Sequence, residues 1–113
     1  MAQPEARRGD IVFAAGGVYA SKPRPAVILQ DDLFDGTDSV TVCPFTTSDV
    51  DAPLLRMAIP ASDATGIDSP SFAMIDKVTT VRRSSAGPAI GRLDSVQMLE
   101  LERRLLVFLG LAH

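Results

Sequence analysis

The chain has 113 residues, 46% of them hydrophobic, which is enough for one compact domain and too little for two. Its formal net charge of -3 argues against a general surface for duplex nucleic acid, which is usually basic, but leaves room for a short single-stranded site served by a few local cations. No apolar run approaches the roughly 20 residues that a membrane span needs. Cys43 is the only cysteine, so no internal disulfide can form, which fits a protein of the reducing cytoplasm. We expect the Cys43 side chain to be a small buried hydrophobe and not a nucleophile.

Residues 1–7 are polar and predict a flexible N-terminal tail before a single domain at 8–113. Short runs of β-branched and other apolar residues, separated by Gly, Pro, Asp and Ser, then predict strands. Five strands are predicted, at 9–14, 26–30, 39–43, 54–60 and 71–78. The third continues into 44–47 and the fifth continues toward 83, and Ile90 marks one more short strand.

The chain closes with a predicted helix at 95–109. Asp94 and Gln97 have the spacing of an N-terminal capping box, and Gly110 stands where a left-handed C-terminal residue belongs. Five apolar residues fall on one face at helical spacing and predict core packing: Met98, Leu101, Leu105, Phe108 and Leu109. Glu100 and Arg104 form an i,i+4 pair on the solvent side. Five or six short strands followed by one helix predict a mainly β (α+β) domain built as a small antiparallel barrel.

Many familiar chemistries lack their residues in this sequence. The only histidine, His113, is the last residue, so nothing supports a paired-histidine nuclease or a Ser/His/Asp triad. There is no Cys/His cluster of the kind that binds zinc. Four aspartates crowd residues 31–38, which is more typical of a solvated turn than of a metal site. We therefore expect neither a metal nor another cofactor.

Arg24 lies between two prolines, at the start of the apolar run 26–30. Each proline fixes its own φ and pushes the residue before it toward extended conformations, so Arg24 is expected in a stiff, extended backbone. A stiff backbone suits a cation that must meet a phosphate in one geometry, because less ordering entropy is lost on binding. The alternative is a plain surface charge at a strand start, where prolines are common.

Several short motifs occur together in one order: 9–12 (GDIV), 24–29 (RPAVIL), 42–47 (VCPFTT), 72–78 (FAMIDKV) and 106–111 (LVFLGL). Over most of residues 8 to 111 this set resembles the MazF/PemK family of type II toxin–antitoxin endoribonucleases. The resemblance implies an SH3-like, CcdB-like barrel with a C-terminal helix, working as a cytoplasmic homodimer with a cognate antitoxin as partner. It also implies metal-independent cleavage of single-stranded RNA, including mRNA, at a short sequence, leaving a 2′,3′-cyclic phosphate and a 5′-hydroxyl.

By position, Arg24 and Thr46 match the two residues to which that family assigns catalysis. Attack by a ribose 2′-hydroxyl builds negative charge on the phosphorane oxygens, and a rigid guanidinium with a hydroxyl donor would stabilise that charge. An arginine pKa above about 12 makes Arg24 a poor base, so we expect charge stabilisation and not proton transfer. The alternative for Thr46 is a strand-end hydroxyl that bonds local backbone.

The sequence departs from the family pattern before Arg24. Family members often carry Gly-Ser-Glu in this loop, whereas residues 20–23 read Ala-Ser-Lys-Pro. The general base is therefore unassigned. Lys77 also stands where glutamine is frequent, which would alter base reading or a dimer contact.

Further RNA contacts are predicted from charge, hydroxyl and aromatic character. Cations would line a groove for the backbone, and aromatic rings would stack on bases, although burial in the core is the alternative for the phenylalanine. The predicted RNA-binding residues are Tyr19, Lys22, Phe45, Thr47, Arg56, Asp76, Lys77 and Arg82.

The sequence alone leaves two other functions open. A gyrase poison of the CcdB type would share the barrel, but those relatives end in Trp-Gly-Ile, and this chain has no tryptophan. The missing loop glutamate also allows a weakly active relative that mainly binds its antitoxin.

Overall fold

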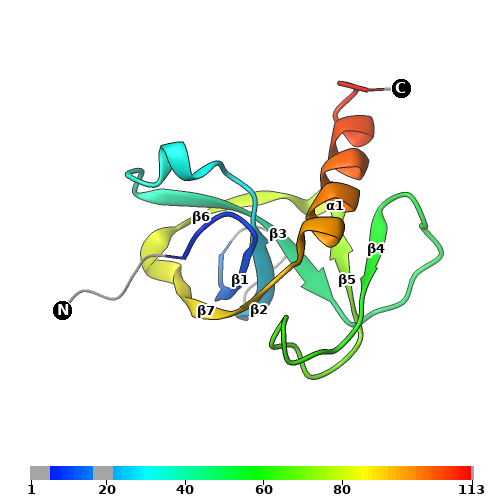
Figure 1. The fold of residues 1–113 in the computed structure, drawn as a ribbon, viewed down its shortest axis with the longest axis horizontal. Coiled ribbons are helices and arrows are strands. Elements are labelled where there is room, and N and C mark those ends of the chain that lie inside the picture. The colour runs from blue at the N-terminus through cyan, green and yellow to red at the C-terminus, as the bar shows by residue number, and fades with distance from the viewer. Residues whose placement is uncertain (1–5, 17–21, 113) are drawn as a thin grey trace.

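The computed structural model describes residues 6–16 and 22–112 (Figure 1). Its strands are β1 (Asp10–Ala14), β2 (Arg24–Ile28), β3 (Ser39–Thr46), β4 (Arg56–Ile59), β5 (Ser71–Met74), β6 (Thr79–Arg82) and β7 (Ala86–Arg92). Three 3-10 turns are η1 (Asp32–Phe34), η2 (Ile75–Lys77) and η3 (Arg83–Ser85), and one α-helix follows, α1 (Ser95–Phe108). Within the described residues, no helix combines the length and apolar character that crossing a membrane requires.

The strands form one antiparallel sheet in the order β4-β5-β3-β2-β1-β7, with β6 also paired to β3. The predicted mainly β domain with a C-terminal helix is therefore confirmed. In the described part of the chain the end strands β4 and β7 do not pair with each other, so the sheet curls without closing into a barrel. The strand around Ile90 is present as β7, longer than predicted.

The single strand predicted from 71 toward 83 is wrong, because this segment forms two strands separated by η2. Both strands pair with β3, through Phe45↔Ala73 and Val42↔Thr79. On β3 the two paired residues are three positions apart, whereas their partners, Ala73 and Thr79, are six positions apart. The three extra residues of the second segment form η2. The turn takes Asp76 out of the sheet, where its carboxylate meets charged neighbours.

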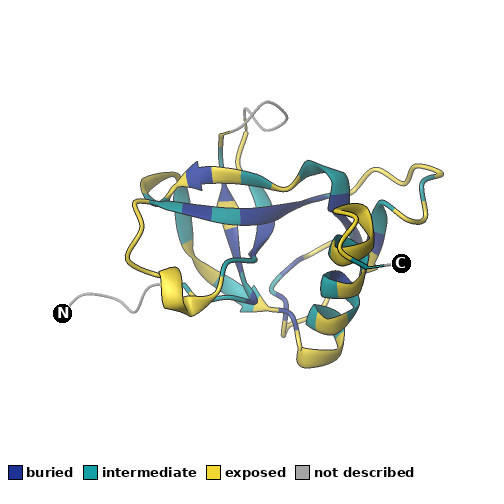
Figure 2. Cartoon of the chain, turned by 90° about the horizontal axis from the view of Figure 1, so that it is seen from above, coloured by how far each residue is buried: buried dark blue, intermediate teal, exposed yellow. Residues whose placement is uncertain are grey.

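The central strands are buried on both faces (Figure 2). Successive side chains on a strand point to opposite faces, so alternate residues enter two different clusters. One cluster lies against α1 and includes Ile11, Val27, Cys43 and Leu101, while the other includes Val12, Ala26, Ile28 and Val42. The curl of the sheet supplies the second buried face, which one helix could not cover.

Helix α1 begins as predicted. The Asp94 carboxylate accepts a hydrogen bond from the Gln97 backbone N–H at 2.7 Å, and the Gln97 side chain accepts one from the Asp94 N–H at 2.9 Å. The helix is followed by Gly110 with φ of 74°. That value is in the left-handed region that glycine adopts without strain.

The predicted core stripe of α1 is only partly correct. Leu101 is fully buried, and Met98 and Leu105 pack against the same cluster. Phe108 and Leu109 are 48% and 61% exposed, so their predicted place in the core is wrong. The last turns of α1 extend beyond the sheet (Figure 1), and helical periodicity continues there with no sheet beneath it.

Replacing Leu101 by alanine should lower the free energy of unfolding by about 2–5 kcal/mol, because it deletes buried methyl groups and leaves a cavity. Val96→Ala is the matched control on the same helix, since Val96 is 75% exposed, and it should change stability by less than about 0.5 kcal/mol. Denaturant unfolding at one fixed protein concentration measures both. Equal losses in the two variants would contradict the placement of Leu101.

Candidate functional site

The two predicted catalytic residues lie at the same end of neighbouring strands. Arg24 opens β2, and Thr46 closes β3. The β2–β3 pairing ends at Ala26↔Pro44, and the same register continued by two residues would set Arg24 opposite Thr46. Because side chains alternate along a strand, Arg24 shares the face of Ala26 and Thr46 the face of Pro44. The register therefore favours both functional groups on one side of the sheet.

The prolines explain why the ladder stops at this point. Pro25 and Pro44 lack an N–H and cannot donate to a neighbouring strand. On its other edge β3 pairs first with β6 and then with β5, where Thr46 lies opposite Phe72. Arg24 keeps its pairing with Ala14 of β1. Arg24 and Thr46 therefore lie just beyond the last β2–β3 pair, each paired only with the strand on its other side.

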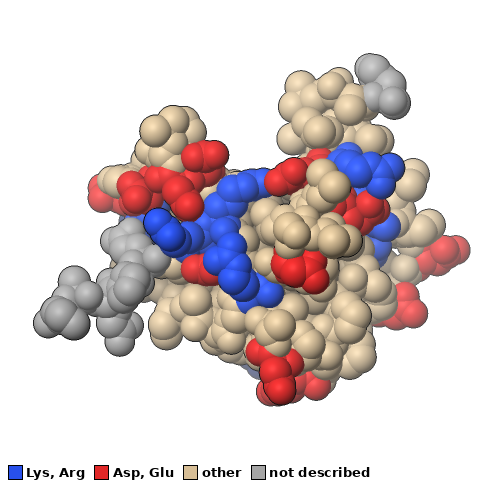
Figure 3. Space-filling view, in the orientation of Figure 1, with Lys and Arg blue, Asp and Glu red and all other residues tan. Residues whose placement is uncertain are grey.

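Arg24 is half-buried, and within residues 6–16 and 22–112 its guanidinium makes no hydrogen bond or ion pair. This availability contrasts with most arginines of the domain. Arg8 contacts Glu102 at 2.5 Å, and Arg92 contacts Asp10 at 2.7 Å. On the face shown in Figure 3, basic side chains likewise lie among acidic ones. A guanidinium without a protein carboxylate is the group best able to receive a phosphate.

The Thr46 hydroxyl has a local partner. Its Oγ1 accepts a hydrogen bond from the Ser48 backbone N–H at 3.1 Å, which is the arrangement expected for a strand-end threonine. A hydroxyl that accepts one bond still has a proton to donate. The local bond therefore fixes Thr46 without using the donor that a phosphate oxygen needs. The neighbouring Thr47 is exposed.

Arg56, Asp76 and Lys77 form an ion cluster. One Arg56 nitrogen, Nη1, lies 2.6 Å from Asp76 Oδ1 and 2.8 Å from the Leu55 carbonyl oxygen, to which it donates. Lys77 Nζ lies 3.5 Å from the other Asp76 oxygen. The side chains of Arg56 and Asp76 are only 13% and 23% exposed. The charge of Arg56 is therefore largely balanced inside the protein.

Burial alone would raise the pKa of Asp76, but the Arg56 hydrogen bond and the positive charges of Arg56 and Lys77 outweigh it and hold that pKa below its usual value. Asp76 is thus a fixed carboxylate at neutral pH. The prediction that these three residues contact RNA stays a prediction, and their contacts show a structural role.

Cys43 is fully buried, as expected from its apolar neighbours. Burial, helped by the negative charge of Asp76, raises the pKa of its thiol to about 12. A thiol with this pKa stays protonated at neutral pH, and the thiolate is the nucleophilic form. The expectation of a small buried hydrophobe is confirmed.

The structure corrects one of the predicted aromatic contacts. Phe45 is 1% exposed and belongs to the core, so the prediction that its ring stacks on a base is wrong. Strand alternation decides this, because Phe45 shares a face with Cys43. Tyr19 lies outside the described residues, whereas Lys22 and Arg82 are exposed.

Sequence reasoning missed a second aromatic ring beside the candidate site. Phe72 is half-buried on β5 and pairs directly with Thr46. The sequence did hold a signal for this ring, because successive strand residues point to opposite faces, which places Phe72 on the face opposite the buried Ala73. The sequence could not show that β5 pairs with the end of β3.

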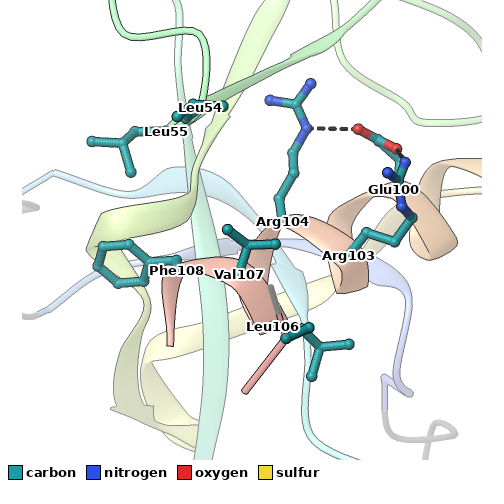
Figure 4. A pocket seen from close by; sticks show the side chains of 9 residues that line it. Leu54, Leu55, Glu100, Arg103, Arg104, Leu106, Val107 and Phe108 are labelled. Atoms are coloured by element: carbon teal, nitrogen blue, oxygen red, sulfur yellow. Dashed lines mark hydrogen bonds and ion pairs between the residues drawn. The ribbon is translucent and has the colours of Figure 1, made fainter. Parts of the chain in front are cut away.

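Two hollows lie near these elements. The first, which we name the Phe72 pocket, has a volume of about 620 Å³ and is lined by Asp49, Val50, Asp51, Pro53, Arg56, Ala58, Phe72 and Arg104. The second, the helix groove, has a volume of about 480 Å³ and lies between α1 and the segment before β4 (Figure 4). Its lining residues are Leu54, Leu55, Glu100, Arg103, Arg104, Leu106, Val107, Phe108 and Ala112. Among the described residues, no three His, Cys, Asp or Glu side chains come together as a metal site.

Comparisons with known proteins agree with this architecture. Residues 7–109 match the family described as PemK-like, MazF-like toxin of type II toxin–antitoxin system. The chain is 60% identical over 107 residues to a protein of Mycolicibacterium smegmatis named probable endoribonuclease MazF, covering 94% of this chain and 98% of that protein.

Solved structures show the same fold. Mycobacterium tuberculosis toxin MazF-mt6 matches with a TM-score of 0.79 at 25% identity, over 92% of this chain and 99% of that one. MazF from Deinococcus radiodurans matches with a TM-score of 0.76 at 21% identity, over 96% and 99% of the two chains. An endoribonuclease from a mycobacterial species, solved with its cognate antitoxin, also has a TM-score of 0.76 at 21% identity, again over 96% and 99%.

The ion cluster predicts how stability depends on pH. The folded-state pKa of Asp76 lies below its unfolded value of about 3.9. Its contribution is therefore fully present above the unfolded pKa and is lost as the pH falls through the folded pKa. We expect Asp76→Asn to be less stable than the wild type at pH 7, with the difference shrinking as the pH falls below about 4.

Denaturant midpoints between pH 7 and pH 3 measure this difference. Asp68→Asn, at an exposed loop carboxylate, is the matched control and should follow the wild type. A difference for Asp76→Asn that persists undiminished at pH 3 would show that its effect does not come from the ion pair.

Proposed function

The chain belongs to the family of PemK-like, MazF-like toxins of type II toxin–antitoxin systems, and on this premise we propose that it is an endoribonuclease that cleaves single-stranded RNA at a short sequence. Family membership rests on a match over residues 7–109 and on 60% identity to a relative named as a probable endoribonuclease. The observation that supports the activity is an available guanidinium, on Arg24, at the strand end where the β2–β3 register, continued by two residues beyond Ala26↔Pro44, would set it opposite Thr46.

In the proposed reaction, the ribose 2′-oxygen attacks the adjacent phosphorus. The bond from the 2′-oxygen to phosphorus forms, and the bond from phosphorus to the 5′-oxygen breaks. The 2′-hydroxyl loses its proton and the 5′-oxygen gains one, leaving a 2′,3′-cyclic phosphate and a 5′-hydroxyl. No water enters this step, and the proposal assigns no metal ion to it.

Arg24 and Thr46 would act on the charge that develops in the transition state. Negative charge accumulates on the non-bridging oxygens as the phosphorane forms, and two fixed donors would stabilise it more than they stabilise the ground state. The guanidinium offers a paired, planar set of N–H donors, while the threonine offers its single hydroxyl proton. Because arginine holds its protons too tightly to act as a base, its part in this scheme is electrostatic.

Arg24→Ala and Thr46→Ala should each lower kcat by about 10²- to 10³-fold, the usual effect of removing one transition-state donor. Arg24→Lys should recover only part of the loss, because an ammonium cannot donate in the paired geometry. Arg7→Ala, at an exposed arginine away from this strand end, is the matched control and should cleave like the wild type. Melting temperatures of all variants establish that they are folded.

The assay uses a long single-stranded RNA with chelator present, followed by mapping of both fragment ends. Cyclic phosphate and 5′-hydroxyl ends are expected. Undiminished cleavage by folded Arg24→Ala would reject the assignment. Inhibition of gyrase without loss of RNA would favour the CcdB-like alternative, and feeble cleavage by the wild type would favour a relative that mainly binds its antitoxin.

We further propose that the chain works in the cytoplasm as a homodimer that a cognate antitoxin neutralises. Relatives of the same fold include an endoribonuclease solved with its cognate antitoxin and MazE–MazF structures from Deinococcus radiodurans. In this chain, several large apolar side chains that line the helix groove are exposed: Leu54, Leu106, Val107 and Phe108 (Figure 4). Leu109, directly after α1, is exposed as well. A contiguous exposed apolar surface is typical of a protein–protein contact.

Leu109→Glu should shift the protein from dimer to monomer at micromolar concentration, because a carboxylate would have to be buried in an apolar contact. Val96→Glu introduces the same charge at the other end of α1 and should leave the assembly unchanged. Sedimentation velocity measures both. A Leu109→Glu variant that stays dimeric would remove the end of α1 from the interface.

A further inference from the structure

We propose that the Phe72 pocket binds one nucleobase of the RNA, next to the phosphate that is cleaved, with the base stacked on the Phe72 ring. This inference rests on the proposed endoribonuclease function and adds to it a specificity-determining residue and the chemistry of its ligand. It depends on strand register, on the polarity of the pocket and on the lack of internal partners for its carboxylates.

The register places Phe72 directly beside Thr46. Thr46 pairs with Phe72 across β3 and β5, and Phe72 pairs with Ala58 across β5 and β4. Residues paired in this way carry their side chains on the same face, with Cβ atoms about 4.5–5.5 Å apart. Thr46, Phe72 and Ala58 therefore form a row. A nucleotide whose phosphate meets Thr46 would have its base within reach of the Phe72 ring.

The ring is accessible on this face. Phe72 is half-buried, while Ser71 and Ala73 on either side of it are buried. The small side chain of Ala58 leaves the space beyond the ring open, and both residues line the pocket. Its volume of about 620 Å³ falls within the range of about 300–1,000 Å³ typical of small-ligand sites. Stacking on an aromatic ring is the common way in which proteins hold an unpaired base.

The charges of the pocket favour a base over a phosphate. Asp49 and Asp51 line its edge, and within the described residues neither carboxylate makes a hydrogen bond or ion pair. Two carboxylates would repel a phosphate, but they can accept hydrogen bonds from the amino and ring N–H groups of a base. The phosphate is thereby left to the uncompensated guanidinium of Arg24.

The arginines of the pocket hold its wall in place. Arg104 Nη1 donates to the carbonyl oxygens of Pro53 at 2.8 Å and of Arg56 at 3.2 Å, and its Nε donates to Glu100 at 2.9 Å. Arg56 is held by Asp76, yet its Nε is buried without a hydrogen-bond partner among the described residues. A buried donor without an acceptor is costly, and here it belongs to a side chain that lines the pocket.

These groups also suggest which bases are preferred. Adenine, cytosine and guanine carry an exocyclic amino group that can donate to a carboxylate, whereas uracil has only its ring N–H. The pocket should therefore select an amino-bearing base over uracil at one position next to the cleaved bond.

The test compares the wild type with Phe72→Ala, Phe72→Leu, Phe72→Tyr and the double variant Asp49→Asn/Asp51→Asn on a randomised single-stranded RNA library, with sequencing of the cleaved ends. Phe72→Ala should lower kcat/KM by about 5- to 150-fold, the fold-change that loss of one base stack represents. Phe72→Leu should behave like Phe72→Ala although it fills the space, and Phe72→Tyr should retain activity. The double variant should relax the base preference at one position only.

Phe34→Ala is the matched control, because Phe34 is an exposed ring in η1, away from the pocket. Melting temperatures exclude unfolding, and Phe72→Leu keeps the test valid if Phe72→Ala does not fold. If Phe72→Ala and Phe72→Leu both cleave with the rate and base preference of the wild type, the inference is overturned while the proposed function stands.

Fluorescence anisotropy with a single-stranded oligonucleotide in which every residue is 2′-deoxy separates binding from cleavage, because this probe has no 2′-hydroxyl to attack the phosphorus. If the wild type fails to cleave RNA but binds this probe in a Phe72-dependent way, the pocket stands and the proposed activity falls. Binding that does not depend on Phe72, with or without cleavage, overturns the pocket.

Discussion

The end of the β2–β3 ladder is the constraint on which the candidate site depends. Two prolines, Pro25 and Pro44, stand where this ladder stops, and neither can supply an N–H to a neighbouring strand. Regular pairing with β2 ends at Ala26↔Pro44, and the next residues of β3 pair only on the other edge of that strand, with β5. The same register, continued by two residues, would set Arg24 opposite Thr46 at the margin of the sheet. The pairing of β3 with β5 brings Phe72 to the side of Thr46.

The charged side chains of the site differ in whether an opposite charge of the protein balances them. Arg24 has no protein carboxylate among the described residues, whereas Arg56 is neutralised by Asp76 in a mostly buried pair. Asp49 and Asp51 line the pocket together with Phe72. In an acidic chain, this local arrangement would direct a phosphate to Arg24 and a base to the pocket. It also predicts weak general affinity for nucleic acid, because few cations among the described residues are uncompensated.

The two hollows of the molecule share one side chain. Arg104 lines both the Phe72 pocket and the helix groove, and it holds the segment before β4 through the carbonyl oxygens of Pro53 and Arg56. Arg104 belongs to α1, so its bonds to these two carbonyl oxygens tie the helix to the wall of the pocket. A protein partner seated in the helix groove would therefore touch a residue that shapes the proposed base site.

Local chemistry in the sequence was sufficient for the order of the main strands along the chain, the capped helix, the buried cysteine and the extended backbone at Arg24, because each depends on residues close together in the chain. Tertiary structure alone decided that Phe45 is core and Phe72 accessible, that η2 splits one predicted strand, and that Phe108 and Leu109 extend beyond the sheet. Periodicity tells which residues share a face, but not what covers that face. Here the curl of the sheet and the change of partner along β3 determine what is covered, and both depend on pairings between residues far apart in the chain.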